Sequence, residues 1–261
     1  MRRMVSAATA ALLIGMPGYA AATNVSAQQS TIKYSTTSGV TSGFGNYTRA
    51  TSIVVYDPAT DTYTLRDTGS LSTQSSFGPS NIASTSGNFI IYSKNGGAET
   101  FRLLDKSAVA LTYVDYGEWK RSSTSNGTTS VNDTFVVFGS KTPSASVPRT
   151  GSASYTTMYD GNFVDKNGEH ALSGAGSMTA DWASGTLSYT ANINGVPSGS
   201  LAFAGSGSIN FRSAGFTTST SSGGYNFSQS GNFYGPSADE VGGLFRLWNR
   251  TGAGQGAFVG K

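Results

Sequence analysis

Residues 186–211 read "TLSYTANINGVPSGSLAFAGSGSINF", and this stretch decides the fold class. Apolar and polar residues alternate in 187–193 and again in 201–203, and Asn194-Gly195 is a turn signal between them. Successive side chains of a strand point to opposite faces, so this alternation predicts two half-buried strands joined in a hairpin. Helical periodicity is nearly absent from the chain, and we therefore expect an all-β protein.

The second half of the chain repeats this pattern, with short turns between the alternating segments. We expect eight strands, near residues 151–164, 170–182, 186–195, 200–211, 215–221, 225–234, 241–248 and 254–260. Glycines inside these segments, such as Gly174 and Gly207, suit the strong coiling of a small closed barrel. Eight up-and-down strands within 149–261 predict an eight-stranded antiparallel β-barrel. A two-sheet sandwich is the alternative that the pattern leaves open.

The first half also reads as short strands rich in β-branched and aromatic residues. Strands are expected at 51–56, 62–66, 88–92, 99–104, 109–116 and 134–138. Pro58 presets the turn of the first pair, and Asn95-Gly96 is the turn of the second. Residues 122–130 are Ser- and Thr-rich, and we expect a polar loop there.

These elements divide the chain into four expected parts after its first 22 residues. A flexible N-terminal segment covers 23–49, and a small β domain covers 50–140. The Ser- and Pro-rich stretch 141–148 is the expected linker, and the barrel covers 149–261.

The chain opens with the pattern of a secretory signal peptide. Arg2 and Arg3 form a charged start, 5–16 is apolar, and small residues lie at 19–22. We expect a signal peptide over 1–22 with cleavage after Ala22, because the apolar run is too short to span a bilayer. The pattern predicts an exported protein.

Charge and cysteine content exclude several classes of protein. The chain has 17 basic and 14 acidic residues, and removal of Arg2 and Arg3 leaves 15 against 14. A balance near zero gives no electrostatic footprint for nucleic acid. The chain has no Cys, so we expect no disulfide and no lipidation. Charged residues make up only 12%, and many short strands joined by Gly-rich turns suit such a composition.

Several motifs resemble one family. The barrel opens with "VPRTGSASY" (147–155) and closes on "GNFYGPSADEVGGLFRL" (231–247) and "GQGAFVGK" (254–261), which together resemble the C-terminal barrel of the transferrin-binding protein B family. The motif residues are Pro148, Arg149, Gly151, Tyr155, Tyr234, Gly235, Pro236, Glu240, Gly242 and Gly243. In the first half, "VVYDPATDTYTL" (54–65) and "ALTYVDYGEW" (110–119) resemble the small β "handle" domain that precedes such barrels.

The resemblance implies an exported, non-enzymatic binding protein. Transferrin-binding protein B proper has two handle-plus-barrel lobes and a lipidation Cys, whereas this chain shows one lobe and no Cys. It is closer to single-lobe relatives that bind haem, haemoproteins or other host proteins. The implied partners are haem, a haem- or metal-carrying protein or a related solute, with an outer-membrane receptor and translocator. The resemblance implies that no cofactor is required and that the protein is located at the bacterial surface or in the extracellular space. The alternatives are a lipocalin-like periplasmic carrier and a surface adhesion module.

The adjacent acids Asp239 and Glu240 invite a catalytic interpretation, which the local pattern disfavours. Neighbouring strand residues point to opposite faces, so the two carboxylates would not face one substrate. Pro236 favours a turn, and Ser237 with Glu240 matches a capping box in which each satisfies a local backbone N–H. We expect a structural corner and no catalytic residue.

His170 is the only histidine and the first candidate for ligand binding. It follows a turn between the first two barrel strands, where an imidazole could reach a flat ligand such as haem. Tyr159 and Phe163, which lead into that turn, are the aromatic candidates for contact with a partner. A zinc site needs more nitrogen and sulfur ligands than one histidine supplies, so we expect no metal.

Other aromatic residues read more simply as core. Tyr113, Tyr116 and Trp119 could form a binding platform, but one face of that segment is expected to be handle core. The barrel aromatics are expected to lie inside the barrel or at its interface with the handle; they are Trp182, Phe203, Phe211, Phe245 and Trp248.

Overall fold

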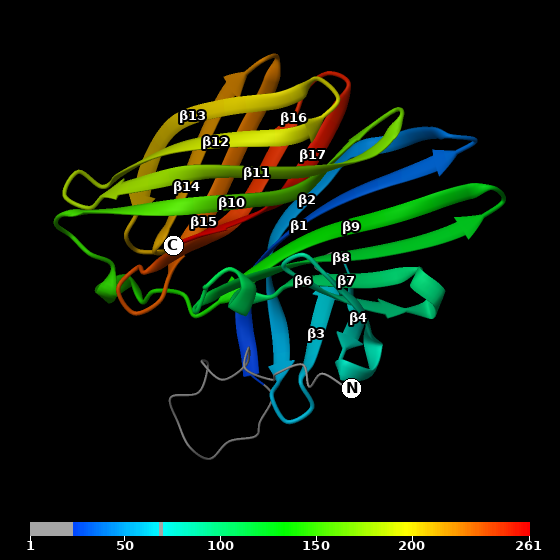
Figure 1. Cartoon of the computed structure of the whole chain (residues 1–261), viewed down its shortest axis with the longest axis horizontal. Helices are drawn as coiled ribbons and strands as arrows, with labels where there is room; N and C mark the ends of the chain where they lie inside the picture. The colour runs from blue at the N-terminus through cyan, green and yellow to red at the C-terminus, as the bar shows by residue number, and fades with distance from the viewer. Residues whose placement is uncertain (1–22, 68–69) are drawn as a thin grey trace.

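The structure is a computed structural model that describes residues 23–67 and 70–261. The expected signal peptide, 1–22, lies outside the described residues. The described chain forms a closed antiparallel barrel and a curled nine-stranded sheet, and the outer wall of the barrel packs on the sheet (Figure 1). The prediction of an all-β protein with a C-terminal eight-stranded barrel is confirmed.

The barrel strands follow one another in sequence and close between the first and the last. They are β10 (Ser152–Asp165), β11 (Gly168–Asp181), β12 (Thr186–Val196), β13 (Gly199–Asn210), β14 (Gly215–Ser222), β15 (Tyr225–Tyr234), β16 (Glu240–Trp248) and β17 (Gly252–Gly260). The barrel has no free edge because every strand pairs on both sides. The sandwich alternative is therefore excluded.

The nine-stranded sheet has the order β4-β3-β2-β1-β9-β8-β7-β6-β5, so its middle is formed by the first two and the last two strands. These are β1 (Thr23–Thr37), β2 (Val40–Asp57), β3 (Thr62–Asp67), β4 (Ser70–Phe77), β5 (Ile82–Ser86), β6 (Phe89–Lys94), β7 (Glu99–Leu104), β8 (Val114–Ser125) and β9 (Thr128–Gly139). Short 3-10 turns interrupt it at η2 (Pro79–Asn81), η3 (Asn95–Gly97) and η4 (Lys106–Ala108), and η5 (Ser144–Ser146) lies before the barrel. Among the residues described, no helix has the length and apolar character to cross a membrane.

Two expected irregular regions are strands instead. Residues 23–49, expected to be flexible, form β1 and the first part of β2, and the expected loop 122–130 is the end of the β8–β9 hairpin. Their Ser and Thr hydroxyls bond across the strands: Ser35 to Ser130 at 3.2 Å and Thr37 to Thr128 at 2.8 Å between hydroxyl oxygens. Threonine is β-branched and favours strands, so a Ser/Thr-rich sequence without charges can form a sheet as readily as a loop.

The expected strand 109–116 is also only partly correct. β8 begins at Val114, and η4 with a short irregular stretch occupies the residues before it. Asp105 caps η4 by accepting a hydrogen bond from the Ser107 N–H at 3.0 Å. The capped turn moves the start of the strand toward the C-terminus.

The barrel interior is filled by side chains. Tyr159, Phe227, Phe245 and Phe258 pack with ring centroids 5.6 to 6.3 Å apart, and all four are nearly fully buried. Glycines make room for them, since a Cβ at Gly161 would lie 2.8 Å from the Phe245 ring. A lipocalin-like carrier requires an interior cavity, so this packing argues against that alternative.

Candidate functional site

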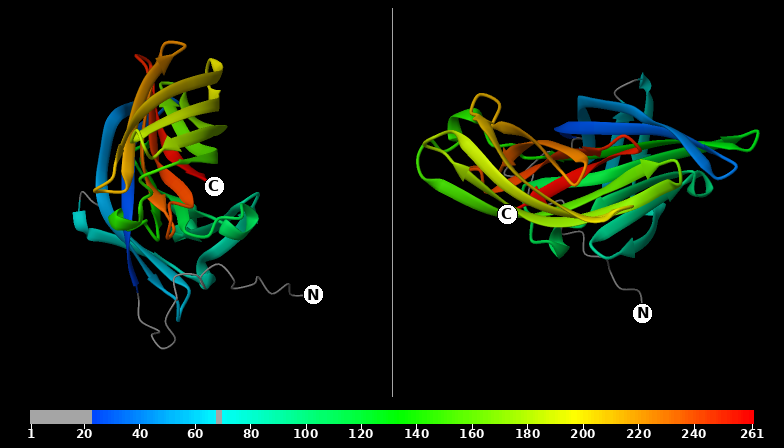
Figure 2. Two further views of the ribbon diagram at one scale, coloured as in Figure 1. Left: turned by 90° about the vertical axis from the view of Figure 1, so that its left-hand side faces the viewer. Right: turned by 90° about the horizontal axis from the view of Figure 1, so that it is seen from above.

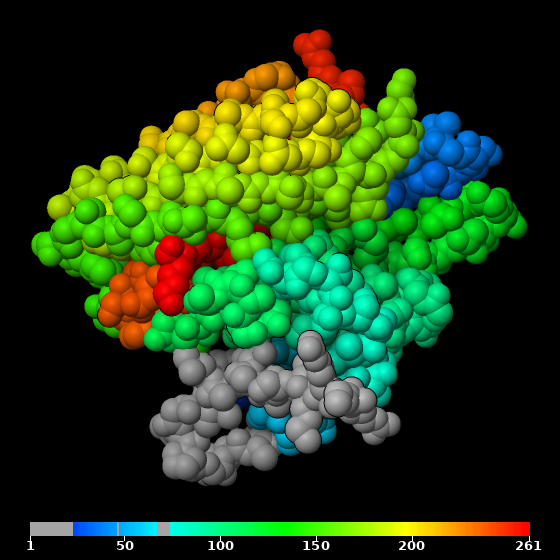
Figure 3. Space-filling view, viewed as in Figure 1, coloured from blue at the N-terminus to red at the C-terminus, as the bar shows by residue number. Residues whose placement is uncertain are grey.

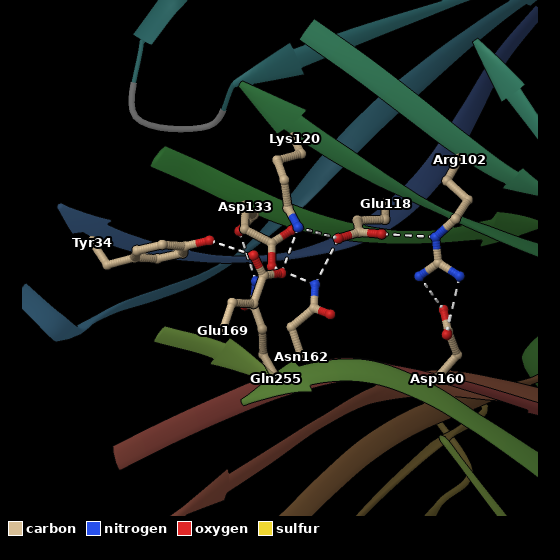
Figure 4. A network of polar contacts seen from close by, with 9 residues as sticks. All are labelled: Tyr34, Arg102, Glu118, Lys120, Asp133, Asp160, Asn162, Glu169 and Gln255. Carbon is tan, nitrogen blue, oxygen red and sulfur yellow. Dashed lines mark hydrogen bonds and ion pairs between the residues drawn. The ribbon is translucent and has the colours of Figure 1, made fainter. Parts of the chain in front are cut away.

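The barrel is fixed to the nine-stranded sheet by a partly buried network of charged, amide and tyrosine side chains (Figure 4). We call this network the seam; its members are Tyr34, Arg102, Glu118, Lys120, Asp133, Asp160, Asn162, Glu169 and Gln255. The first five of these come from β1, β7, β8 and β9, and the other four from β10, β11 and β17. The seam therefore joins segments of the chain that are far apart in sequence.

Arg102 carries one half of the seam. Its Nε donates to Glu118 Oε2 at 2.8 Å, within the sheet. Its Nη1 and Nη2 donate to the two carboxylate oxygens of Asp160 on the barrel, at 3.1 and 2.7 Å. A bidentate guanidinium–carboxylate pair fixes distance and angle together, so this contact sets how the barrel lies on the sheet.

Lys120 carries the other half. Its Nζ lies 3.1 Å from Glu118 Oε1 and 2.5 Å from Glu169 Oε1, which comes from the barrel. Tyr34 donates its hydroxyl to the second oxygen of Glu169 at 2.6 Å. A single ammonium thus bridges a carboxylate of the sheet and a carboxylate of the barrel.

Two amides complete the seam. Asn162 Nδ2 donates to Glu118 Oε1 at 2.6 Å and to Asp133 Oδ2 at 2.9 Å. Gln255 Nε2 donates to the backbone carbonyl of Asp133 at 2.6 Å. Both amides lie on the outer wall of the barrel, so they connect β10 and β17 to β8 and β9.

The charges of the seam shift the pKa values of its acids in opposite directions. Burial alone would raise the pKa of Glu118, but Lys120 and Arg102 outweigh burial and lower it to about 2. Burial and then the neighbouring Glu118 raise the pKa of Asp133 well above its ordinary value. Four carboxylates face two cations in the seam, so Asp133 is the acid on which a proton is retained most readily.

The seam also contains a cluster of three acidic residues whose spacing could hold a metal ion. Carboxylate oxygens of Glu118, Asp133 and Glu169 lie within 4.8 Å of one another. The ammonium of Lys120 contacts two of these three residues and supplies the positive charge there. The arrangement is that of an ion-pair network, and we assign no metal to it.

Glu240 forms a second connection, which sequence reasoning placed wrongly. Its side chain is fully buried, and it accepts hydrogen bonds from the backbone N–H groups of Thr112, Tyr113 and Val114, at 2.7 to 3.0 Å. The expected capping box with Ser237 is therefore incorrect, because the Glu240 carboxylate accepts from backbone N–H groups at the start of β8 and not from the N–H of Ser237. The N–H of Ser237 is instead bonded by Asp239 at 3.2 Å.

The remaining motif residues support this corner. Gly235 has a left-handed φ of 87°. The Thr142 hydroxyl donates a hydrogen bond to the backbone carbonyl of Gly235 at 2.8 Å. Tyr155 donates its hydroxyl to the carbonyl of Ala238 at 2.6 Å from inside the barrel. Arg149 lies over the ring of Phe211, with the guanidinium carbon 4.1 Å from its centroid. The motif thus positions the barrel against the linker and the sheet.

Three further motif residues lie on β16 and in the approach to β10. A Cβ at Gly242 would meet Val114 at 2.5 Å, and one at Gly243 would meet the Ser230 carbonyl at 2.3 Å. Pro148 directly precedes the turn that leads to β10. The glycines are thus needed where β16 approaches the sheet and its neighbouring strand closely.

The predicted binding residues do not form one exposed site. Tyr159 and Phe163 point into the barrel and are 2% and 0% exposed, because strand alternation places both on the inner face of β10. They therefore cannot contact a partner at the surface. His170 lies at the barrel rim, where its Nε2 is 3.3 Å from Asp165 Oδ1 and its side chain is about one third exposed.

The aromatic residues proposed as core lie where that interpretation placed them. Tyr116 and Trp119 are 1% exposed, and Trp119 donates its ring N–H to Glu99 at 2.9 Å. Trp182 and Phe203 belong to the barrel core. Trp248 lies at the interface with the sheet, where Arg246 packs over its ring.

Beyond the seam, the four central strands of the sheet continue as a polar extension. We call residues 35–42 and 122–130 the blade; it contains no charged residue. Figures 2 and 3 show these β1–β2 and β8–β9 hairpins, in blue and green, projecting beside the barrel. The Thr41 N–H donates to the carbonyl of Lys166 at 3.0 Å, so the blade lies against the β10–β11 turn.

Strand direction places several barrel turns at the end of the molecule where the blade lies. The turns are 166–167, 197–198, 223–224 and 249–251. We call this end, together with the blade, the hairpin end. The seam and the Glu240 corner hold the two sheets in one orientation, and hairpins of both sheets are thereby presented together.

Sequence reasoning missed the seam and the blade. A usable signal for the seam was the alternation of Glu118 and Lys120 in a chain with only 12% charged residues. Charges that recur every second residue within a strand point to one face, and that face needs partners. The partner residues Asp160 and Glu169 carry no comparable local signal.

Comparison with solved structures identifies the fold. Transferrin-binding protein B from Haemophilus parasuis is 19% identical, with a TM-score of 0.56 over 90% of this chain and 44% of that chain. The isotype 1 protein from serogroup B Neisseria meningitidis is 16% identical, with a TM-score of 0.55 over 88% of this chain and 43% of that chain. An intact transferrin-binding protein B with N and C lobes is 17% identical, with a TM-score of 0.53 over 88% and 45%.

These similarities establish a transferrin-binding protein B-like fold, as the sequence motifs suggested. The chain spans less than half the length of each of these solved chains. No protein-family model matches the chain, and no curated protein matches it.

Proposed function

We propose that this chain is an exported, non-enzymatic binding protein that captures a partner protein at the hairpin end. The observation that carries the proposal is the meeting of hairpins from both sheets at one end, above a seam that fixes their relative position. A rigid scaffold that presents several turns together is a common arrangement for recognition. The polar, uncharged blade gives such a surface many hydrogen-bonding groups.

The proposed partner is a host protein that carries iron or haem. The solved structures of similar fold are described as transferrin-binding proteins, and the sequence also resembles single-lobe relatives that bind haemoproteins. We place the chain at the bacterial surface or outside the cell, with an outer-membrane receptor and translocator as further partners. Its localisation can be tested by cell fractionation, in which a purely periplasmic pool would contradict the surface assignment.

Capture of a carrier protein fits the site better than direct capture of haem by His170. The imidazole is already paired with Asp165, and the aromatic candidates near it are buried in the barrel. A haemin titration separates the two forms of the proposal. A Soret shift in the wild-type protein that is lost in His170→Ala would assign haem to His170, whereas no shift leaves the carrier protein as the partner.

The test shortens the blade without changing its register. Ser123 pairs with Ser130 and Thr124 with Thr129, so deletion of these four residues removes two cross-strand pairs and keeps the Ser125–Thr128 turn. Binding of the wild-type and the shortened chain to immobilised transferrin, lactoferrin and haemoglobin is then measured. We expect one of these proteins to bind and the shortened chain to lose at least about tenfold in affinity.

A matched control carries a Gly-Ser-Gly insertion after Ala183, in an exposed turn at the opposite end of the barrel. Exposed turns tolerate such insertions, so the control should fold and bind like the wild-type chain. Binding that is unaffected by the shortened blade but lost in the control would place the partner at the wrong end. Failure of all three carrier proteins to bind would overturn the proposed partner class.

A further inference from the structure

A groove lies on the other side of the junction between the barrel and the sheet. It has a volume of about 630 Å³ and lies between β1 and β2 on one side and the outer wall of β13, β14 and β15 on the other. This volume is within the range of small-molecule binding sites, roughly 300 to 1,000 Å³. The hairpin end does not include these residues, so the groove is a separate surface.

The barrel wall of the groove is built from hydroxyl and amide side chains. Alternation along the strands points these side chains outward, while a neighbour such as Ile209 is buried in the barrel. The outward residues are Ser208, Asn210, Thr217, Ser230 and Asn232. The facing wall adds Ser26, Gln28 and Thr51. Both walls therefore offer mainly neutral hydrogen-bond donors and acceptors, and Ala27, Phe216 and Tyr234 add a smaller apolar part.

Among the described residues that line the groove, Lys141 is the one that carries a charge, and none of them is a carboxylate. Within the described part of the chain, the ammonium of Lys141 has no ion-pair partner. Partial burial lowers the pKa of this ammonium, as expected for a cation without a nearby acid. At the edge of the groove, Arg49 donates to the hydroxyl and to the carbonyl of Ser230.

Arg49 ties β2 to β15 and adds a second positive charge close to the groove. The groove thus combines hydroxyl and amide side chains with one lining ammonium that has no ion-pair partner among the described residues.

We propose that the groove binds a hydroxyl-rich monoanion, an acidic sugar, with its carboxylate at Lys141 and its hydroxyls on the Ser, Thr and Asn side chains of the walls. One lining ammonium matches one carboxylate, whereas a polyphosphate would require several cations. The polar walls are unsuited to haem or to a lipid chain. This inference goes beyond the proposed capture of a partner protein and does not depend on it.

The probes are D-glucuronate and D-glucose, which share one ring and differ in a carboxylate at C6. Calorimetric or NMR titration of the full chain should show that glucuronate binds at least about tenfold more tightly than glucose. Lys141→Gln should weaken glucuronate binding by about tenfold and leave glucose binding unchanged. Lys141 is exposed at the surface, so this variant should fold normally.

The matched control is Lys33→Gln, which removes the charge of another exposed lysine, on β1 outside the groove. It should bind glucuronate like the wild-type chain. The two sources of such a ligand are a free sugar and the end of a glycan. An oligosaccharide that ends in glucuronate distinguishes them, because tighter binding of the oligosaccharide than of free glucuronate would identify the end of a glycan as the ligand. The proposal is overturned if neither free glucuronate nor the oligosaccharide binds, or if Lys141→Gln binds glucuronate as tightly as Lys33→Gln.

Discussion

The blade continues three of the strands that carry the seam, β1, β8 and β9, yet the two regions are built from opposite kinds of polar residue. The seam is charged, partly buried and bonded to the barrel, whereas the blade is uncharged, largely exposed and bonded mainly to itself. A buried ion pair becomes costly when it loses a partner, while exposed hydroxyl pairs contribute little. Stability should therefore depend on the junction, and recognition on the hairpin end.

The largest effect is expected at the Glu240 corner, which shares the junction with the seam. Glu240→Ala leaves three backbone donors without their acceptor in a fully buried place, which should cost about 4 kcal/mol of unfolding free energy. Urea denaturation measures the loss. Glu240→Gln keeps one carbonyl acceptor and should lose about half as much. A loss below about 1 kcal/mol for the alanine variant would show that the corner does not hold the sheets together.

Arg102→Met tests the seam itself. The variant keeps most of the side-chain volume but leaves Asp160 unpaired and Glu118 with Lys120 as its remaining cation. Loss of one partner from a largely buried ion-pair network should cost about 3 kcal/mol. Thermal and urea unfolding at pH 7 measure the loss of unfolding free energy. The stability of Arg102→Lys is expected to lie between that of the wild type and that of Arg102→Met. Stability equal to the wild type would mean that the charges only fill space.

A pH dependence is expected from Asp115 on β8. Burial raises the pKa of Asp115 to about 7, with Lys106 3.9 Å away as a weak counter-charge. The folded protein therefore holds a proton that the unfolded chain releases near pH 4, so this contribution to stability is lost as pH rises from about 4 to 7. Asp115→Asn cannot lose a proton and should be about 2 kcal/mol more stable than the wild type at pH 8.

The comparison of the two proteins across pH isolates this residue. Other buried acids such as Asp133 titrate in both proteins, so the difference between their stability curves reports Asp115 alone. The difference should be largest above pH 7 and should shrink toward pH 4. A difference that is the same at every pH would contradict the assigned protonation.

The smallest effect is expected in the blade. Thr37→Val combined with Thr128→Val removes a hydroxyl pair, 2.8 Å between its oxygens, and keeps the β-branched shape of both side chains. Unfolding free energy should change by less than about 0.5 kcal/mol, because the pair is exposed to water. Calorimetry measures the change. A loss as large as that of Arg102→Met would remove the distinction between the two regions.

The barrel could be predicted from sequence because its signals are local. Alternation in 187–193 gave the strand, and the turn glycines gave its ends within a few residues. The blade was missed for the converse reason, since Ser, Thr and Gly mark loops in most contexts. What makes 122–130 a hairpin is pairing of β9 with β1, about 90 residues away in sequence, as in Thr37 with Thr128.

The seam illustrates a second limit. Arg102 and Asp160 are 58 residues apart, and neither residue has a local pattern that names the other. The Glu240 motif was recognised as structural, but its partners were sought nearby, whereas they lie more than 120 residues earlier. Local turn residues therefore explained why the motif bends the chain, whereas tertiary contacts determine which groups donate hydrogen bonds to the Glu240 carboxylate.

The most direct test of the proposed binding role is hydrogen–deuterium exchange of the chain with and without the carrier protein that binds it in the immobilised-protein assay. Binding at the hairpin end predicts slower exchange in 36–41, 124–129 and 166–167, with the seam strands already protected in the free protein. Slower exchange confined to the opposite turns, 182–185 and 211–214, would contradict the proposal.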